Sequence, residues 1–365
     1  MKKHLILAIN PGSTSTKVAI FENEKQLAVS NIKHNDSDLA HFETIFDQLD
    51  YRAGVVKKFL EDNNYKISDL SAIVGRGGPI RPLPSGTYMV DEELENHLRN
   101  KYAVIHVSLI GGLIAKKLAG EAVKNVFIVD PVCVDELCDE ARVSGHPMIE
   151  RQSLSHALNI KAIGKRAAAD LNAEYDKLNL VIAHLGSGTS VTAHKGGRMI
   201  DVNNASDEGP FSIDRTGGMP LRAVINVCYS GKYSKSETEA MFLKKGGMLA
   251  YFGVNDGKAI EDMAHNGDKK ALLVYKGLCH QVCKEIGAMA TVLEGKVDAI
   301  VITGGMAYSK WFIDMVKQKV SYISKVMVYP GEDEASALAA GALRVLTGSE
   351  NAKKIAEQPL PEKII

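Results

Sequence analysis

The sequence predicts an α/β protein that contains two copies of one domain. Strand-sized apolar runs alternate with segments whose apolar residues recur at helical spacing, which is typical of sheets covered by helices. Two segments about half a chain apart also share one plan of strands and turns. The 365 residues suffice for two domains with separate cores. We therefore expect one domain at 1–145, completed by a C-terminal helix at about 335–365, and a second domain at 146–334.

The individual elements follow from the apolar pattern. Short runs rich in Val, Ile, Leu and Ala predict strands at 5–9, 18–21, 72–74, 126–130, 180–184, 191–193, 299–303 and 326–329. Apolar residues at helical spacing predict helices at 42–60, 153–171, 269–293 and 334–346.

The internal repeat links the two halves. The segments 5–32 and 180–203 both read as strand, Gly/Ser/Thr turn, strand, second turn and strand. Gly12 aligns with Gly186 at an offset of 174 residues, and Asn10 aligns with His184. No Pro/Ser-rich linker separates the halves, so we expect them to pack closely around a cleft, with the boundary near 144–147.

Charge and composition argue against several classes of partner. Lys plus Arg and Asp plus Glu each total 44, so bulk charge favours neither nucleic acid nor an anionic membrane. No apolar run approaches the ~20 residues that span a bilayer, and the N-terminal run lacks an export cleavage pattern. The five cysteines form no CxxC pair, which favours reduced thiols. We therefore expect a cytoplasmic protein without a nucleic-acid or membrane partner.

The two aligned turns suit phosphate. Motifs of P-loop enzymes, metalloproteases, α/β hydrolases and protein kinases are absent. A tight glycine turn can point successive backbone N–H groups at one anion, and hydroxyls beside it add donors. The residues that could act in this way are Ser13, Ser15 and Lys17 in the first half and Gly186, Ser187, Gly188 and Thr189 in the second. A third glycine run at Gly304 and Gly305 ends a strand and could receive a flat group such as adenosine, or could be a simple packing point.

Charged residues complete the candidate site. Arg76 and Arg215 are flanked by glycines, which favours clamping of an anion such as a transferring phosphoryl group. Asp130 follows a strand at the edge where α/β sheets bind ligands. Glu332, Asp333 and Glu334 begin a helix, and they could cap it or hold Mg²⁺ together with phosphates and water.

Six motifs occur in this order along the chain: AINPGSTSTK, VGRGGP, HLGSGTSV, DEGPFSIDRTGGMP, VITGGMAYS and PGEDEASALAAG. Together they resemble the motifs of the acetate and butyrate kinase family. The resemblance covers about 5–346 and implies two ribonuclease-H-like βββαβαβα domains with the active site in the cleft between them. It implies ATP and Mg²⁺, a short-chain carboxylic acid as the phosphoryl acceptor, and a homo-oligomer.

The resemblance also assigns roles to residues. Arg76 and Arg215 match the catalytic arginines, Asp130 the catalytic aspartate, and Glu334 the glutamate assigned to Mg²⁺. The residues that match nucleotide and phosphate motifs are Asn10, Ser13, Ser15, Lys17, His184, Gly186, Ser187, Gly188, Gly304, Gly305 and Met306.

The sequence departs from the acetate kinase pattern near the expected acid site. Gly77 and Gly78 stand where acetate kinases have valines, so we expect room for a longer acyl tail, with Ile105 and Arg151 also lining that pocket. Gln152 stands where acetate kinases have a second active-site histidine, which argues against a proton-bearing role there. The two glycines favour butyrate or a branched short-chain acid as the substrate. An acetate or propionate kinase, a sugar kinase of the same fold and a partner-regulated ATPase remain as alternatives.

Overall fold

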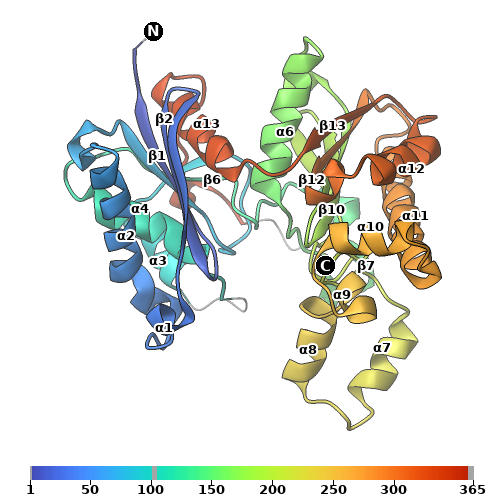
Figure 1. The fold of residues 1–365 in the computed structure, drawn as a ribbon. Helices are drawn as coiled ribbons and strands as arrows, with labels where there is room; N and C mark the ends of the chain where they lie inside the picture. The colour runs from blue at the N-terminus through green and yellow to red at the C-terminus, as the bar shows by residue number, and fades with distance from the viewer. Residues whose placement is uncertain (1, 101–104, 361–365) are drawn as a thin grey trace. The chain divides into compact units, whose positions relative to one another are not determined.

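The computed structural model describes residues 2–100 and 105–360, which divide into two compact units (Figure 1). The first unit contains the chain up to Asp135, the short piece Ala157–Asn159 and the C-terminal segment from Asp333. The second unit contains Glu136–His156 and Ile160–Glu332.

The first unit thus ends earlier than the predicted 145. Two local contacts explain this difference. The backbone N–H of Cys138 donates to Ile200 O at 2.9 Å. Val143 pairs with Glu150 in a small hairpin of β7 (Val143–His146) and β8 (Ile149–Glu150). These bonds attach residues 136–145 to the second unit.

The first unit is built on a six-stranded sheet. Its order is β3 (Lys25–Lys33), β2 (Ser15–Glu22), β1 (Leu5–Pro11), β4 (Ala72–Arg76), β6 (Val126–Val129) and β5 (Thr87–Met89). The strands β1, β4 and β6 are parallel, whereas β2, β3 and β5 are antiparallel to their neighbours. The ends of β1 and β4 therefore lie side by side, which places Asn10 and Arg76 at one edge.

Helices cover both faces of this sheet (Figure 1). On one side lie α2 (Leu49–Asp62), α3 (Glu92–Arg99) and α4 (Leu109–Ala119), and on the other lies α13 (Glu334–Leu346). The helix α4 approaches β4 closely, because a Cβ on Gly75 would lie 2.1 Å from Gly111 O. The predicted helix 334–346 is confirmed, whereas the one at 42–60 begins only at Leu49 after a short 3-10 turn, Ile45–Gln48.

The second unit repeats this plan. Its five-stranded sheet has the order β11 (Arg198–Val202), β10 (Thr189–Lys195), β9 (Leu180–Leu185), β12 (Ala299–Gly304) and β13 (Val326–Pro330). This order corresponds to β3-β2-β1-β4-β6 of the first unit. The duplicated α/β architecture is therefore confirmed.

Helices also cover the second sheet. The long α11 (Lys269–Val292) packs on β9 and β10 beside α12 (Lys310–Val320). On the other side α6 (Ala157–Asp170) packs on β9, where a Cβ on Gly164 would lie 3.0 Å from the side chain of Ile182. The shorter helices α7 (Leu221–Cys228), α8 (Lys235–Leu243), α9 (Gly247–Phe252) and α10 (Gly257–His265) follow β11. Within residues 2–100 and 105–360, no helix combines the length and apolar character needed to cross a bilayer.

A fully buried histidine on β10 makes the second unit sensitive to acid. His194 lies between Tyr175 Oη at 2.7 Å and Thr192 Oγ1 at 2.8 Å. Burial, and to a lesser degree the charge of Lys161, lowers the pKa of His194 well below its ordinary value of 6.5. As the pH falls below about 6.5, the unfolded chain therefore binds a proton at this histidine that the folded chain does not bind. The free energy of unfolding is unaffected by protonation of His194 above about pH 6.5 and decreases below it.

We expect the free energy of unfolding to fall between pH 7 and pH 5, and to fall less steeply in His194→Gln. Urea denaturation at several pH values measures both slopes. Equal slopes in the two proteins would contradict a neutral, buried His194.

Candidate active site

The turn between β1 and β2, residues 12–14, opens into a cavity of about 430 Å³ in the first unit. The polar residues that line it include every residue predicted to contact phosphate in this half. They are Asn10, Ser13, Ser15, Lys17, Asn31, Arg76, His106 and Glu334, joined by Pro11, Gly12 and Val107. Gly12 N donates to Ser15 O at 2.8 Å and closes the turn.

Arg76, Asn10 and Glu334 form one cluster in this cavity. Arg76 Nη1 lies 2.6 Å from Glu334 Oε1 and 2.8 Å from Oε2. Asn10 Nδ2 also donates to Glu334 Oε2, and Asn10 Oδ1 lies 3.4 Å from Arg76 Nη1. The structure therefore brings together a predicted catalytic arginine, the predicted metal-binding carboxylate and the first residue of the phosphate motif, from three separate elements.

The donor set here fits Mg²⁺ only in part. In the described residues no group of three or more His, Cys, Asp or Glu side chains gathers in a way that could hold a metal ion. Protein-bound Mg²⁺ commonly takes one or two carboxylates and completes its shell with phosphate oxygens and water. Glu334 is a carboxylate of this kind, because it lies beside the phosphate turn and its present partners are an arginine and an amide.

Asp130 directly follows β6, as the sequence predicts, and its side chain is bound by protein groups. Its side chain is 3% exposed, and Oδ1 accepts hydrogen bonds from Ser85 Oγ at 2.6 Å and Gly86 N at 2.7 Å. Asp130 is not among the residues that line the cavity beside Arg76. Within the first unit its side chain therefore fixes the turn at Ser85–Gly86, and its role as the catalytic aspartate stays a prediction.

In the second unit the turn of residues 186–188 lies beside a pair of histidines. His184 on β9 is completely buried, and its Nε2 is 3.1 Å from Glu332 Oε1. The ring of His156 stacks on His184 with centroids 4.0 Å apart, and His156 Nδ1 is 3.0 Å from Ser190 Oγ. A Cβ on Gly186 would lie 3.1 Å from His184 Nε2, so the histidine reaches the turn itself.

His156 is a site residue that the sequence did not reveal. The motif comparison pointed to Gln152, which is exposed in the structure, whereas His156 four residues later is the one that lies at the site. The sequence signal that could have identified His156 is its position at the end of the motif ERQSLSH, just before the helix α6.

Arg215 lies next to the same turn. A Cβ on Gly188 would be 2.9 Å from Arg215 Nη1 and 3.1 Å from His156 Cε1. Arg215 Nη1 donates to Ala205 O at 2.9 Å, which leaves most of the guanidinium fork available to an anion. The turn, both histidines and the second predicted arginine thus form one group in this unit.

A larger cavity of about 1080 Å³ extends from this turn. This volume is at the upper end of the range for small-molecule sites. Gly186, Ser187, Gly305 and Met306 line it, together with Trp311, whose indole stacks on Tyr275 at 4.8 Å.

Gly304 does not line this cavity. It adopts φ +92°, and a Cβ there would lie 2.4 Å from Leu185 O, so the residue is required for close packing of β12 on β9. Gly304 therefore has a structural role, and its contact with a nucleotide stays a prediction, while Gly305 has nothing within 4 Å of the corresponding position.

The predicted acyl pocket around Gly77 and Gly78 is wrong in its physical basis. A Cβ on Gly77 would lie 2.8 Å from Pro131 Cβ, and one on Gly78 would lie 2.7 Å from Leu109 N. Core atoms thus already fill the space that the missing side chains leave. Ile105 is 56% exposed and is not among the residues lining the cavity beside Arg76, although Val107 is.

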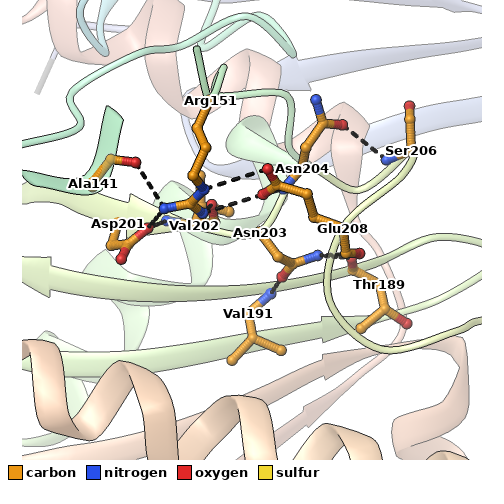
Figure 2. Close-up of polar contacts among 10 residues, drawn as sticks. All are labelled: Ala141, Arg151, Thr189, Val191, Asp201, Val202, Asn203, Asn204, Ser206 and Glu208. Atoms are coloured by element: carbon orange, nitrogen blue, oxygen red, sulfur yellow. Dashed lines mark hydrogen bonds and ion pairs between the residues drawn. The ribbon is translucent and has the colours of Figure 1, made fainter. Parts of the chain in front are cut away.

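Arg151, the fourth residue assigned to that pocket, is instead the centre of a polar network in the second unit (Figure 2). Its guanidinium donates to Asp201 Oδ1 at 3.1 Å, to Glu208 Oε2 at 3.1 Å and to Val202 O at 2.8 Å. Asn203 in the same loop donates to Thr189 O and accepts from Val191 N. Arg151 therefore ties the end of β11 and the loop after it to Ala141, Asn203 attaches that loop to β10, and the donors of Arg151 are occupied by protein groups.

Comparisons with known proteins identify the family of this chain. Residues 148–327 match the model of the acetokinase family. The chain is 45% identical to butyrate kinase 2 of Clostridium acetobutylicum over 353 residues, which are 96% of this chain and 99% of that protein. It is 49% identical to a probable butyrate kinase of Thermotoga petrophila over 349 residues, 95% and 97% of the two chains.

Solved structures agree on the fold. The acetate kinase of Porphyromonas gingivalis matches with a TM-score of 0.79 at 20% identity, covering 94% of this chain and all of that one. A propionate kinase of Francisella tularensis matches with a TM-score of 0.75 at 20% identity, covering 93% and 98%. The chain therefore belongs to the acetokinase family and is a phosphotransferase of the short-chain carboxylate kinase class.

Proposed function

We propose that the protein transfers the γ-phosphoryl group of ATP to butyrate or a branched short-chain carboxylic acid, giving ADP and an acyl phosphate. The observation that carries this proposal is the cluster of Arg76, Asn10 and Glu334 beside a phosphate-type turn. Relatives named butyrate kinases that align over 95% of the chain support it, and they leave a sugar kinase or a partner-regulated ATPase without comparable support.

The chemistry suits residues that are mostly cations and hydrogen-bond donors. A carboxylate is ionised at pH 7, so no general base is needed. One carboxylate oxygen attacks the γ-phosphorus and forms a new P–O bond, while the bond to the ADP oxygen breaks and ADP leaves with its electron pair. Arg76 would orient the acid and the phosphoryl group in the first unit, and Arg215 and His184 would bind phosphoryl oxygens in the second.

The remaining site residues would bind the nucleotide. Ser187, Gly305 and Met306 line the large cavity that we assign to ATP, and Ser13, Ser15 and Lys17 line the smaller one. Glu334 would hold Mg²⁺, which supplies charge neutralisation for the phosphates when it is bound. The acyl tail would contact Pro11 and Val107, the apolar residues beside Arg76.

Trapping of acyl phosphates as hydroxamates tests the function. With ATP and Mg²⁺, the ratio kcat/KM should rise from acetate through propionate to butyrate or isobutyrate. Each buried methylene contributes ~0.8 kcal/mol, and one methylene commonly discriminates by ~10-fold or more. A preference for acetate would make this an acetate or propionate kinase. Failure with every acid from two to six carbons, together with phosphorylation of a sugar, would overturn the proposal.

We also propose that the enzyme is a homo-oligomer in the cytoplasm. None of the residues of α7 is buried, and Leu221 there is 73% exposed, which is the type of surface that subunit contacts cover. The five cysteines are free thiols, which favours a reducing compartment.

A further inference from the structure

A completely buried arginine lies beneath the first phosphate turn. Arg52 belongs to α2, and its side chain is among the largest that are fully shielded from solvent. It is not part of any motif that the sequence pattern singles out. Charged side chains are almost never fully buried unless they are paired. The role of Arg52 therefore follows from the groups that its guanidinium contacts.

The guanidinium of Arg52 holds the turn from its inner side. Nη1 donates to Ser15 O at 3.0 Å and to Thr16 Oγ1 at 2.9 Å. Nη2 donates to Ser13 O at 3.3 Å, and Nε donates to Gln48 Oε1 at 3.0 Å. The planar fork thus ties α2 to both ends of the turn, a geometry that a single ammonium cannot reproduce.

These bonds determine which groups the turn presents to a ligand. The carbonyl oxygens of Ser13 and Ser15 accept from Arg52, and that of Thr14 accepts from His34 N at 2.9 Å. All three carbonyls are therefore engaged by the interior of the unit. Among the described residues, the backbone N–H groups of Ser13 and Thr14 donate no hydrogen bond to the protein. The turn consequently offers donors, and an anion does not meet carbonyl oxygens there.

The charge of Arg52 is not balanced by an acid. No Asp or Glu lies within ion-pair distance of it in residues 2–100 and 105–360, and its four acceptors are all uncharged. The nearby imidazole of His34 cannot balance this charge, because it is either neutral or positive; burial and then the charge of Arg52 lower its pKa, against a smaller opposite effect of Asp38. An uncompensated buried charge is unfavourable unless an opposite charge approaches it. A phosphate on the outer side of the turn is an opposite charge of this kind.

We propose that Arg52 is a positioning residue for phosphate binding, which fixes the donor-presenting conformation of residues 12–15 and places a permanent positive charge behind it. This inference rests on the proposed function in one respect, namely that this turn binds a phosphate of the nucleotide. It does not depend on which acid is the acceptor.

Two substitutions separate the charge from the bonds. Arg52→Gln keeps a hydrogen-bond donor but removes the charge, whereas Arg52→Lys keeps the charge and loses the fork. We expect Arg52→Gln to raise the KM for ATP about tenfold or more, the scale of one charge-assisted hydrogen bond, and to leave the KM for the carboxylic acid unchanged. Arg52→Lys should restore part of the ATP affinity.

Arg344→Gln is the matched control. Arg344 forms an ion pair of 2.6 Å with Glu350 in the same unit, away from the turn. Its substitution should lower Tm without changing the KM for ATP. If Arg52→Gln lowers Tm in the same way and leaves the KM for ATP unchanged, Arg52 is only structural and the proposal is wrong. If Arg52→Gln does not fold, an unchanged KM for ATP in Arg52→Lys overturns the proposal instead.

Calorimetric titration with a non-hydrolysable ATP analogue distinguishes the two hypotheses. If the wild type forms no acyl phosphate but binds the analogue, and Arg52→Gln binds it about tenfold more weakly, the acceptor is wrong and the role of Arg52 stands. If both proteins bind the analogue equally, the role of Arg52 is wrong whatever the acceptor.

Discussion

Alanine at Arg76 or at Arg215 is expected to lower kcat by ~10³-fold or more, the scale seen when an arginine that stabilises a transferring phosphoryl group is removed. The charge on that group is spread over three oxygens, and a guanidinium matches it with parallel donors. Each arginine lies beside a phosphate turn, Arg76 through the cavity of residues 12–15 and Arg215 through its approach to Gly188. The effect should appear in kcat rather than in Tm, because neither side chain forms part of an apolar core.

The two variants differ in one informative respect. Arg76→Ala also leaves Glu334 without its cation, so its Mg²⁺ dependence should change as well. The guanidinium of Arg215 donates to Ala205 O and lies 3.8 Å from Asp214 Oδ1, so Arg215→Ala leaves that half-buried carboxylate, rather than Glu334, without its neighbouring cation. Lysine at either position should restore part of kcat. A drop of several degrees in Tm with intact specific activity would show instead that the arginines are structural.

The sequence predicts the backbone of the site better than its side chains. The two aligned turns were visible because glycine, serine and threonine between short apolar runs are typical of tight turns between strands. The proximity of Asn10 and Arg76 follows from the parallel register of β1 and β4, in which Ile9 pairs with Gly75. Glu334 contacts Asn10 and Arg76 because α13, near the end of the chain, packs on the first sheet. Only the resemblance to a known family indicated this contact.

The acyl pocket shows why side-chain surroundings were harder to predict. A glycine in the sequence reveals that a side chain is absent but not which atoms occupy its place, and at Gly78 that place is occupied by Leu109. The same limit applies to Arg151, whose partners Asp201 and Glu208 lie 50 and 57 residues away in the chain. Arg52 was overlooked for the opposite reason, because an arginine within a helical pattern normally lies on a solvated face.

Two adjacent glycines, of which only Gly305 lines the large cavity, give the second large effect. Alanine at Gly304 would place a methyl group 2.4 Å from Leu185 O and force a positive φ of +92° on a residue with a side chain. Neither the strand β9 nor the backbone of Gly304 can move without breaking the ladder between β9 and β12, in which Thr303 pairs with His184. Overpacking and backbone strain each cost about 1–3 kcal/mol. We therefore expect Gly304→Ala to lower the free energy of unfolding by about 3 kcal/mol or more, which corresponds to a decrease in Tm of roughly 10 °C for a unit of this size.

Gly305→Ala is the matched control, because nothing lies within 4 Å of its added methyl group. Its Tm should stay near that of the wild type, while the methyl group enters the cavity that we assign to ATP and raises the KM for ATP without changing that for the acid. Thermal unfolding followed by circular dichroism measures the first effect, and steady-state kinetics with each substrate varied in turn measures the second. If Gly304→Ala instead kept its Tm and lost only ATP affinity, Gly304 would contact the nucleotide as the motif implies. If Gly305→Ala bound ATP as the wild type does, the large cavity would not be the nucleotide site, because a methyl group on its wall would then meet no ligand.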